Sequence, residues 1–209
     1  MELIVDDKRN FEFEGNPEDV FSALAAIDKH LQEQGRAMLE VKVNGETLAP
    51  DDLLARLEST AIENVHTLEV RSSDLAELVA NSLTDLEAAL PDLPEACRML
   101  AELFHGESPD QGFGAFNELA RIWSHVKAQQ ARITALLQLD MAQLTVGDKP
   151  ADQFHEELNQ FLEEAATAIE SGDCVLLGDL LEYELAPRAE QETELVNKLK
   201  GEATAALGQ

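Results

Sequence analysis

A change in the spacing of apolar residues near residue 72 constrains the fold of this chain more than any other feature. Before it, short runs such as MELIV, NFEFE and LEV alternate apolar and polar positions, which is the period of half-buried strands. After it, apolar residues recur every three or four positions, as in amphipathic helices. The sequence therefore predicts an α+β protein with two domains, an α/β domain over 1–72 and a helical bundle over 73–209.

The first 72 residues predict the element order strand, strand, helix, strand, short strand, strand. MELIVDD and NFEFEG form a hairpin around the polar turn DDKR. Asn16 as N-cap and Pro17 at the first helical position begin a helix that ends at Gly35. The strand MLEVKV then reaches the tight turn Asn44-Gly45, and a short helix is expected after Pro50. NVHTLEVRSS supplies the last strand.

This element order, ββαββ, resembles the β-grasp fold of ubiquitin and its relatives. The resemblance covers residues 1–72 and rests on the order of elements. The functions known for that fold have no support in these residues. Modifiers and sulfur carriers end in a free Gly-Gly tail, whereas this segment continues into RSSDLAEL, and β-grasp ferredoxins need four cysteines, whereas this segment has none.

The rest of the chain predicts about five antiparallel helices, because short connections join long amphipathic stretches. Ser72 or Ser73 is expected to cap the first helix, and TVGDKP is expected to be a loop. The expected helices cover residues 74–90, 94–105, 115–139, 150–171 and 173–206.

The stretch GDCVLLGDLLEYELAP, residues 172–187, predicts a central helix that is apolar over most of its circumference. Pro187 is expected to kink it or to start a new helix, and Arg188 to pair with a carboxylate one turn back, such as Glu184. Its buried side is expected to comprise Cys174, Leu177, Leu181 and Leu185, extended by Val175, Leu176, Leu180 and Tyr183.

Three carboxylates on this stretch, Asp179, Glu182 and Glu184, have two interpretations. They are the polar edge of a central helix, or they form an acidic rim that binds a lysine or arginine of a partner protein.

Two carboxylate–imidazole pairs have the i, i+3 spacing that di-iron bundles use, Glu102 with His105 and Asp152 with His155. Both also have a simpler explanation, because a histidine is favoured at a helix C-terminus and an aspartate at a helix N-terminus. Phosphate loops, nucleophile elbows and zinc-protease spacings are absent from the sequence. We therefore expect no enzymatic activity and no cofactor.

The formal net charge of −27, from 42 acidic and 15 basic residues, disfavours nucleic acids and anionic membranes as partners. No apolar run reaches the roughly 20 residues that span a bilayer, and MELIVDDKRN lacks the pattern of a signal peptide. Cys97 and Cys174 are expected to be buried free thiols, and their spacing also allows a disulfide between them. A cytoplasmic protein is the expectation.

The pattern GDCVLLGDLLEYELAP after an acidic amphipathic helix resembles a group of bacterial proteins of unknown function. Acidity and helix number also resemble flagellar export chaperones, which hold a secreted subunit in a groove. The leading hypothesis is a non-enzymatic adaptor or chaperone whose partner carries a basic patch. The alternatives are a bundle that binds a small molecule or metal, with or without catalysis, and a structural homodimer.

Overall fold

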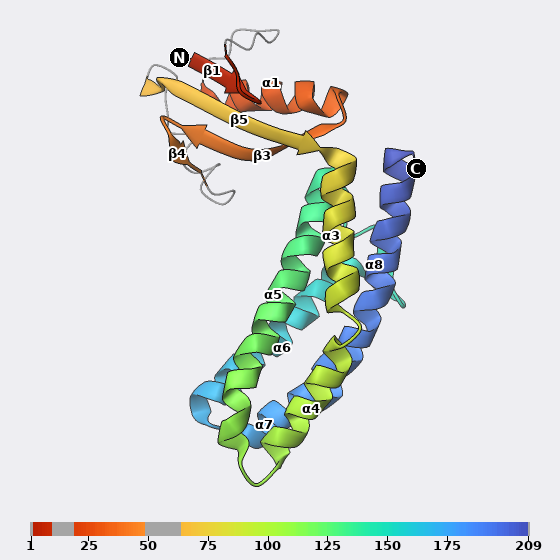
Figure 1. The fold of residues 1–209 in the computed structure, drawn as a ribbon. Coiled ribbons are helices and arrows are strands. Elements are labelled where there is room, and N and C mark those ends of the chain that lie inside the picture. The colour runs from red at the N-terminus through yellow and green to blue at the C-terminus, as the bar shows by residue number, and fades with distance from the viewer. Residues whose placement is uncertain (1, 10–18, 49–63, 209) are drawn as a thin grey trace. The chain divides into compact units, whose positions relative to one another are not determined.

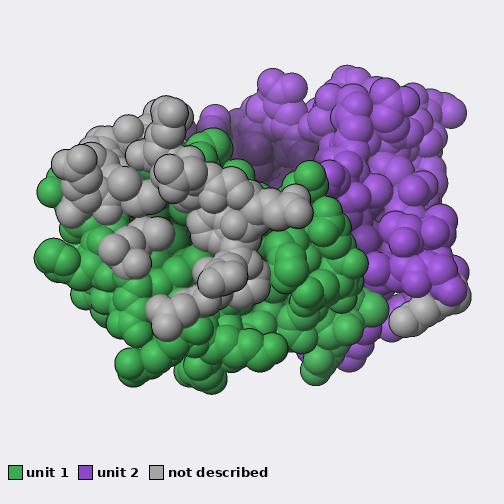
Figure 2. Space-filling model, turned by 90° about the horizontal axis from the view of Figure 1, so that it is seen from above, with its two compact units in different colours: residues 1–78 green, residues 79–209 purple. Residues whose placement is uncertain are grey.

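A computed structural model describes residues 2–9, 19–48 and 64–208 of the chain. The chain divides into two compact units, residues 1–78 and residues 79–209 (Figure 2). Each unit has its own secondary structure and its own core. The fold class that the sequence predicts, α+β with a small sheet domain followed by a helical bundle, is confirmed.

Over its described residues, unit 1 is a mixed five-stranded sheet with α1 (Val20–Glu33) packed against it (Figure 1). The strand order is β2-β1-β5-β3-β4, with β1 parallel to β5 and the other neighbours antiparallel. The bounds are β1 Glu2–Val5, β2 Lys8–Arg9, β3 Arg36–Val43, β4 Glu46–Thr47 and β5 Thr67–Asp74. Apolar residues of α1, β1, β3 and β5 meet in one buried core.

The start of α1 differs from the sequence prediction. Its N-cap is Asp19, whose side chain accepts a hydrogen bond from the Ser22 backbone N–H at 2.7 Å. Asn16 and Pro17 lie outside the described residues, as do NFEFEG and the short helix expected after Pro50. Strand β2 occupies Lys8–Arg9, so the turn between the first two strands is shorter than DDKR.

The helix after the sheet is capped by Asp74, not by Ser72 or Ser73. The Asp74 carboxylate accepts from the Glu77 backbone N–H at 3.0 Å at the start of α3 (Leu75–Ala89). Ser72 remains in β5, where its hydroxyl donates to Asp6 at 2.6 Å. Strand β5 therefore ends at Asp74, one residue beyond the end of the predicted strand, so neither serine is free to cap the helix.

Unit 2 is built from helices (Figure 1). After α3 come α4 (Leu93–His105), the short 3-10 turn η2 (Pro109–Gln111), α5 (Gly112–Leu137) and α6 (Ala151–Ser171). The chain ends with α7 (Cys174–Asp179), the π-helical segment η3 (Leu180–Leu185) and α8 (Ala186–Leu207). Helix α4 packs against α5, α7, η3 and α8. None of the helices within the described residues is both long enough and apolar enough to cross a bilayer.

The segment TVGDKP, expected to be a loop, is a small hairpin. Strands β6 (Thr145–Val146) and β7 (Lys149–Pro150) pair antiparallel around Gly147, which has a φ of 57°. The Gly147 backbone N–H donates to the Glu194 carboxylate of α8 at 3.1 Å, which anchors this turn on the bundle.

The stretch 172–187 is not one regular α-helix. Its π-helical turns precede Pro187, which has no N–H to donate and whose ring crowds the carbonyl of Tyr183. Part of the predicted buried side is wrong: Val175, Leu176 and Tyr183 are 64%, 41% and 63% exposed. Leu177, Leu181 and Leu185, on the other part of the predicted side, are fully buried.

Candidate functional site

A groove of about 900 Å³ lies between α4 and α5 and is lined mainly by apolar side chains. Met99 and Leu103 of α4 and Ile122 of α5 are 60%, 40% and 39% exposed. Such a group of exposed large apolar residues is a common mark of an interaction site. The lining comprises Ala96, Met99, Leu100, Glu102, Leu103, Gly106, Glu107, Ser108, Gln111, Ala115, Glu118, Leu119 and Ile122.

The groove is left open because the most apolar face of α4 packs against other helices. Leu93, Cys97 and Phe104 are buried on that helix, which packs against α7, η3 and α8. The beginning of α5 is held close to α4, since a Cβ added at Gly112 would lie 2.8 Å from the Phe104 ring. The outer apolar residues of α4 are left without cover.

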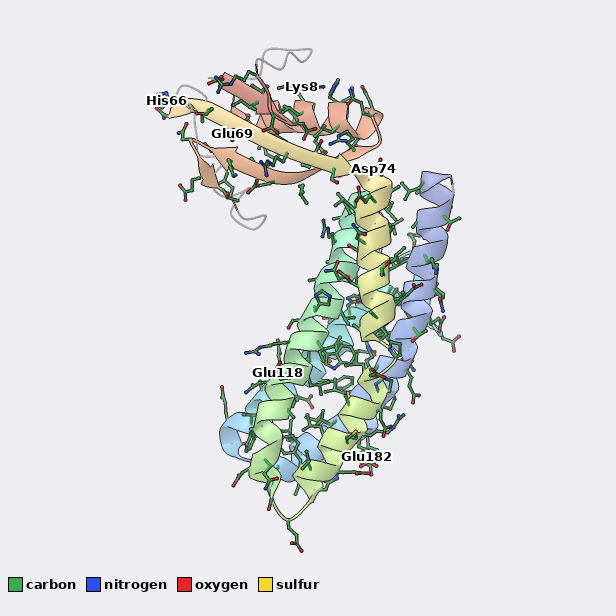
Figure 3. All side chains as sticks on the ribbon, viewed as in Figure 1. Lys8, His66, Glu69, Asp74, Glu118 and Glu182 are labelled. Atoms are coloured by element: carbon green, nitrogen blue, oxygen red, sulfur yellow. The ribbon has the colours of Figure 1, made fainter. Side chains whose placement is uncertain are left out.

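Carboxylates border the groove on both walls. Glu102 belongs to α4, Glu118 belongs to α5 (Figure 3), and Glu107 lies in the connection between these helices. Glu118 pairs with Arg121 at 2.6 Å. Within the described part of the chain, Glu102 and Glu107 form no ion pair. The groove therefore combines an apolar floor with negative borders.

A smaller hollow of about 280 Å³, here called the acidic notch, is lined by Arg98, Glu102, Glu182 and Tyr183. Glu102 lines both the notch and the groove. Tyr183 is exposed, and the neighbouring Glu182 carboxylate raises the pKa of its phenol. The notch brings one of the predicted rim residues, Glu182, next to the groove.

His105 lies between two of the predicted rim carboxylates. Its Nε2 is 3.2 Å from Asp179 Oδ1, and its Nδ1 is 3.8 Å from Glu182 Oε2. The ring packs directly on Gly178, where an added Cβ would lie 2.4 Å from Nε2. Glu184 is exposed and does not line the notch. Of the three carboxylates predicted to form an acidic rim, Asp179 and Glu182 therefore lie together around His105, whereas Glu184 does not line the notch.

The two predicted metal-ligand pairs lie in different surroundings. His105 contacts Asp179 and Glu182, whereas Glu102 faces the groove and the notch. Asp152 and His155 both line a second cavity, between α5 and α6. Over residues 2–9, 19–48 and 64–208, no group of three or more His, Cys, Asp or Glu side chains is placed to hold a metal ion.

The interior of unit 2 contains polar side chains that sequence reasoning missed. Gln130 of α5 and Glu192 of α8 are fully buried, and the Gln130 amide donates to the Glu192 carboxylate at 2.5 Å. Arg188 is 5% exposed and stacks on the Phe154 ring at 3.2 Å from the centroid. Its Nη1 donates to Glu157 at 3.4 Å, so the predicted pairing with Glu184 is wrong.

Lys127 and His155 extend this buried cluster towards the second cavity. The Lys127 ammonium contacts His155 Nδ1. Burial lowers the pKa of Lys127 to about 8, although the Glu192 carboxylate partly opposes this effect. Burial and the two cations Lys127 and Arg188 lower the pKa of His155 to about 4. His155 is therefore neutral near pH 7, and burial raises the pKa of Glu192.

The second cavity, of about 710 Å³, is lined by residues of α5, α6 and their connection. Ala131, Ala135 and Met141 provide apolar surface, while Asp152 and Glu156 provide charge. The two cysteines lie elsewhere and are free, with Cys97 buried and Cys174 half-buried. Burial raises the pKa of Cys97 to about 11, so this thiol is unreactive.

Two family models match the chain, one in each unit. Residues 1–74 match the TP0873 N-terminal domain, and residues 81–194 match a domain of unknown function, DUF8042. The second match covers more than half of the 209 residues, so the chain belongs to the DUF8042 family. The resemblance to an uncharacterised family is thereby confirmed. No curated protein and no solved structure matches the chain.

Proposed function

We propose that this protein is a non-enzymatic adaptor or chaperone that binds another protein in the groove between α4 and α5. The observation that carries the proposal is the set of exposed apolar residues Met99, Leu103 and Ile122 inside a groove with carboxylate borders. An apolar centre with a polar rim is the usual composition of a protein–protein interface. The proposal includes the expectations from the sequence that the protein is bacterial and cytoplasmic and that it acts in export or flagellar assembly.

The charge of the protein favours a basic partner. Carboxylates at the groove border and in the acidic notch bind guanidinium or ammonium groups well. The net charge of −27 also steers basic proteins towards the chain and repels nucleic acids. Asp179 and Glu182 extend the negative surface past the notch.

Capture from a native lysate tests the proposed site through matched variants. Wild-type protein should retain a partner that Leu103→Glu loses, because a charge in the groove disrupts apolar contact. Val175→Glu places the same charge on a more exposed apolar residue that does not line the groove, and it should retain the partner. Equal loss in both variants, or in neither, would exclude the groove as the binding site.

The same partner allows the acidic rim to be tested by kinetics. Glu182→Lys reverses a charge beside the groove, so it should lower the association rate constant several-fold at low salt. If Glu182 is buried in the contact, the dissociation rate should rise instead. Surface plasmon resonance at two salt concentrations measures both. Binding that is independent of salt and unchanged by Glu182→Lys would leave the acidic rim without a role.

A second candidate function is the binding of a small molecule in the cavity between α5 and α6. Its support is the partly buried, neutral His155 at a cavity of about 710 Å³ with mixed apolar and polar lining. A ligand that co-purifies with the protein and is lost in Ala135→Trp, which fills the cavity, would favour this function. Mass spectrometry of the native protein detects such a ligand.

A further inference from the structure

We infer that the occupant of the α4–α5 groove is a short amphipathic helix of the partner protein, with lysine or arginine on both borders of its apolar face. This inference rests on the proposed function and adds the conformation, the length and the charge of the bound segment. It follows from the walls of the groove, its extent along α4 and the position of its carboxylates.

The walls of the groove favour a helix over an extended peptide. Both walls are α-helices, so their backbone N–H and C=O groups are already bonded within α4 and α5. An extended peptide gains its main-chain hydrogen bonds from a free sheet edge, which these walls do not offer. A bound segment must satisfy its own backbone, and a helix does so while presenting one apolar stripe.

The extent of the groove sets the length of the segment. The lining runs from Ala96 on α4 to Gly106, which directly follows the last residue of that helix, a separation of ten residues. At about 1.5 Å per residue this corresponds to about 15 Å. A partner helix of about three turns fills this length. Met99 and Leu103 lie one turn apart on α4, and the flexible Met99 side chain adapts to the shape of the incoming residue.

The borders of the groove determine the charge of the segment. Glu102 on α4 and Glu118 on α5 lie on opposite walls, so cations are favoured on both sides of the apolar stripe. A long basic side chain on the α4 side also reaches Glu102 at the edge of the acidic notch. Acidic segments are repelled by the same carboxylates.

Other occupants fit these borders less well. A second copy of the chain would bring its own Glu102, Glu107 and Glu118 against the same residues, and each copy carries a net charge of −27. Like charges brought together across an interface are destabilising. An anionic membrane surface meets the same repulsion.

Three labelled synthetic peptides of 14 residues test the inference with the full-length protein. The first has leucines at helical spacing and lysines on both borders. The second has the same composition in scrambled order, and the third has glutamates in place of the lysines. Fluorescence anisotropy at low salt should show at least tenfold tighter binding of the first peptide than of the other two.

Groove variants locate the binding. Leu103→Glu on α4 and Ile122→Glu on α5 should each weaken binding of the first peptide at least tenfold, and Val175→Glu should not. Both groove residues are partly exposed, and circular dichroism checks that each variant remains folded. Binding of the first peptide that survives both groove variants would overturn the inference.

The remaining outcomes separate this inference from the proposed function. Equal binding of the scrambled peptide would exclude a helical occupant, and equal binding of the acidic peptide would exclude charge recognition. A dimer in sedimentation that Leu103→Glu dissociates would make a second copy the occupant. If no peptide binds but a lysate partner is still lost with Leu103→Glu, the inference fails and the proposed function stands. If the lysate partner is insensitive to Leu103→Glu, the proposed function fails.

Discussion

The space available for an added methyl group differs sharply between two glycines in the first turn of α5. A Cβ at Gly112 would lie 2.8 Å from the Phe104 ring, and Phe104 is 2% exposed and so has little room to move. At Gly114 nothing lies within 4 Å of an added Cβ. The two positions are two residues apart on one helix, and the same substitution has opposite consequences there.

Gly112→Ala should therefore lower the free energy of unfolding by about 1–3 kcal/mol, since overpacking of a core costs this much. Gly114→Ala should raise it by up to about 1 kcal/mol, because alanine is the better helix former. Urea unfolding of both variants measures the difference. A Gly112→Ala variant as stable as Gly114→Ala would show that α4 and α5 are not in close contact at this point.

The buried His155 predicts how stability depends on pH. Its pKa is lowered from 6.5 in the unfolded chain to about 4 in the fold, so the unfolded chain takes up the proton first. The free energy of unfolding should therefore fall as the pH is lowered from about 6.5 to about 4, and this contribution is complete above 6.5.

His155→Gln should flatten the stability profile within that window, as measured by urea unfolding at intervals of pH. His125→Gln makes the same change at an exposed position of α5 and should keep the wild-type profile, since His155 is still present. A profile in His155→Gln that is as steep as in the wild type would exclude His155 as the source of the pH dependence. The buried Glu192 cannot replace it, because its raised pKa has the opposite effect on stability as the pH falls.

At the scale of elements, the stretch 172–187 combines a correct and an incorrect prediction. Leu180 was expected on the buried side and is 5% exposed, whereas Leu176 was expected there and is 41% exposed. Helical spacing places both on adjoining faces. The backbone between them is α-helical, with the Leu180 N–H donating to the Leu176 carbonyl, so packing against other helices decides which of the two is buried. The π-helical segment from Leu180 to Leu185 has no local sequence signal other than Pro187.

Leu180→Ala should lower the free energy of unfolding by about 2–5 kcal/mol, because it leaves a cavity in the bundle. Leu176→Ala removes the same atoms from a partly exposed site and should cost much less. Chemical denaturation with both variants tests whether η3 is part of the core. A loss below about 0.5 kcal/mol for Leu180→Ala, as at surface positions, would contradict its buried place.

The sequence predicted the order of elements well because strand and helix periods are local properties. The strands β1, β3 and β5 and the helices α3 to α8 appear where alternating or helical spacing indicated them. Gln130 and Glu192 look like ordinary exposed residues of amphipathic helices, yet they are buried against each other from helices 62 residues apart. Only the packing of distant segments creates this cluster.

The candidate site was predicted in part for the same reason. Ile122 has helical spacing with the buried Leu119 and Val126 of α5, yet it is 39% exposed because the neighbouring helix α4 leaves a groove there. The rim residues Asp179 and Glu182 lie together on His105, which the sequence had grouped with Glu102. Which helix covers which face depends on tertiary packing. The spacing of apolar residues along the sequence does not determine it.

At the scale of the whole molecule, the excess of acidic residues opposes folding. With 42 acidic and 15 basic residues, most carboxylates have no cation to pair with, so they repel one another in the compact state. Salt shortens the reach of this repulsion from about 30 Å at 0.01 M to about 8 Å at physiological ionic strength.

Raising the salt concentration over that range should therefore increase the melting temperature at neutral pH, by a few degrees, as measured by circular dichroism. Near the isoelectric point of about 4.3 the repulsion is largely cancelled, and the same addition of salt should have little effect. A melting temperature that falls with salt at neutral pH would mean that surface ion pairs such as Lys200–Glu87 outweigh the repulsion.

The π-helical segment before α8 acts as an angular spacer. One residue advances an α-helix by about 100°, since each turn holds 3.6 residues. A π-helical turn holds more residues than an α-helical turn, so Leu180–Leu185 accommodates one extra residue over the same rotation. A regular α-helix over the same residues would advance everything after it by about that angle, so Leu199 would leave the core and Glu194 would enter it. Deletion of one residue from η3 is therefore better tolerated than deletion of one residue from α8.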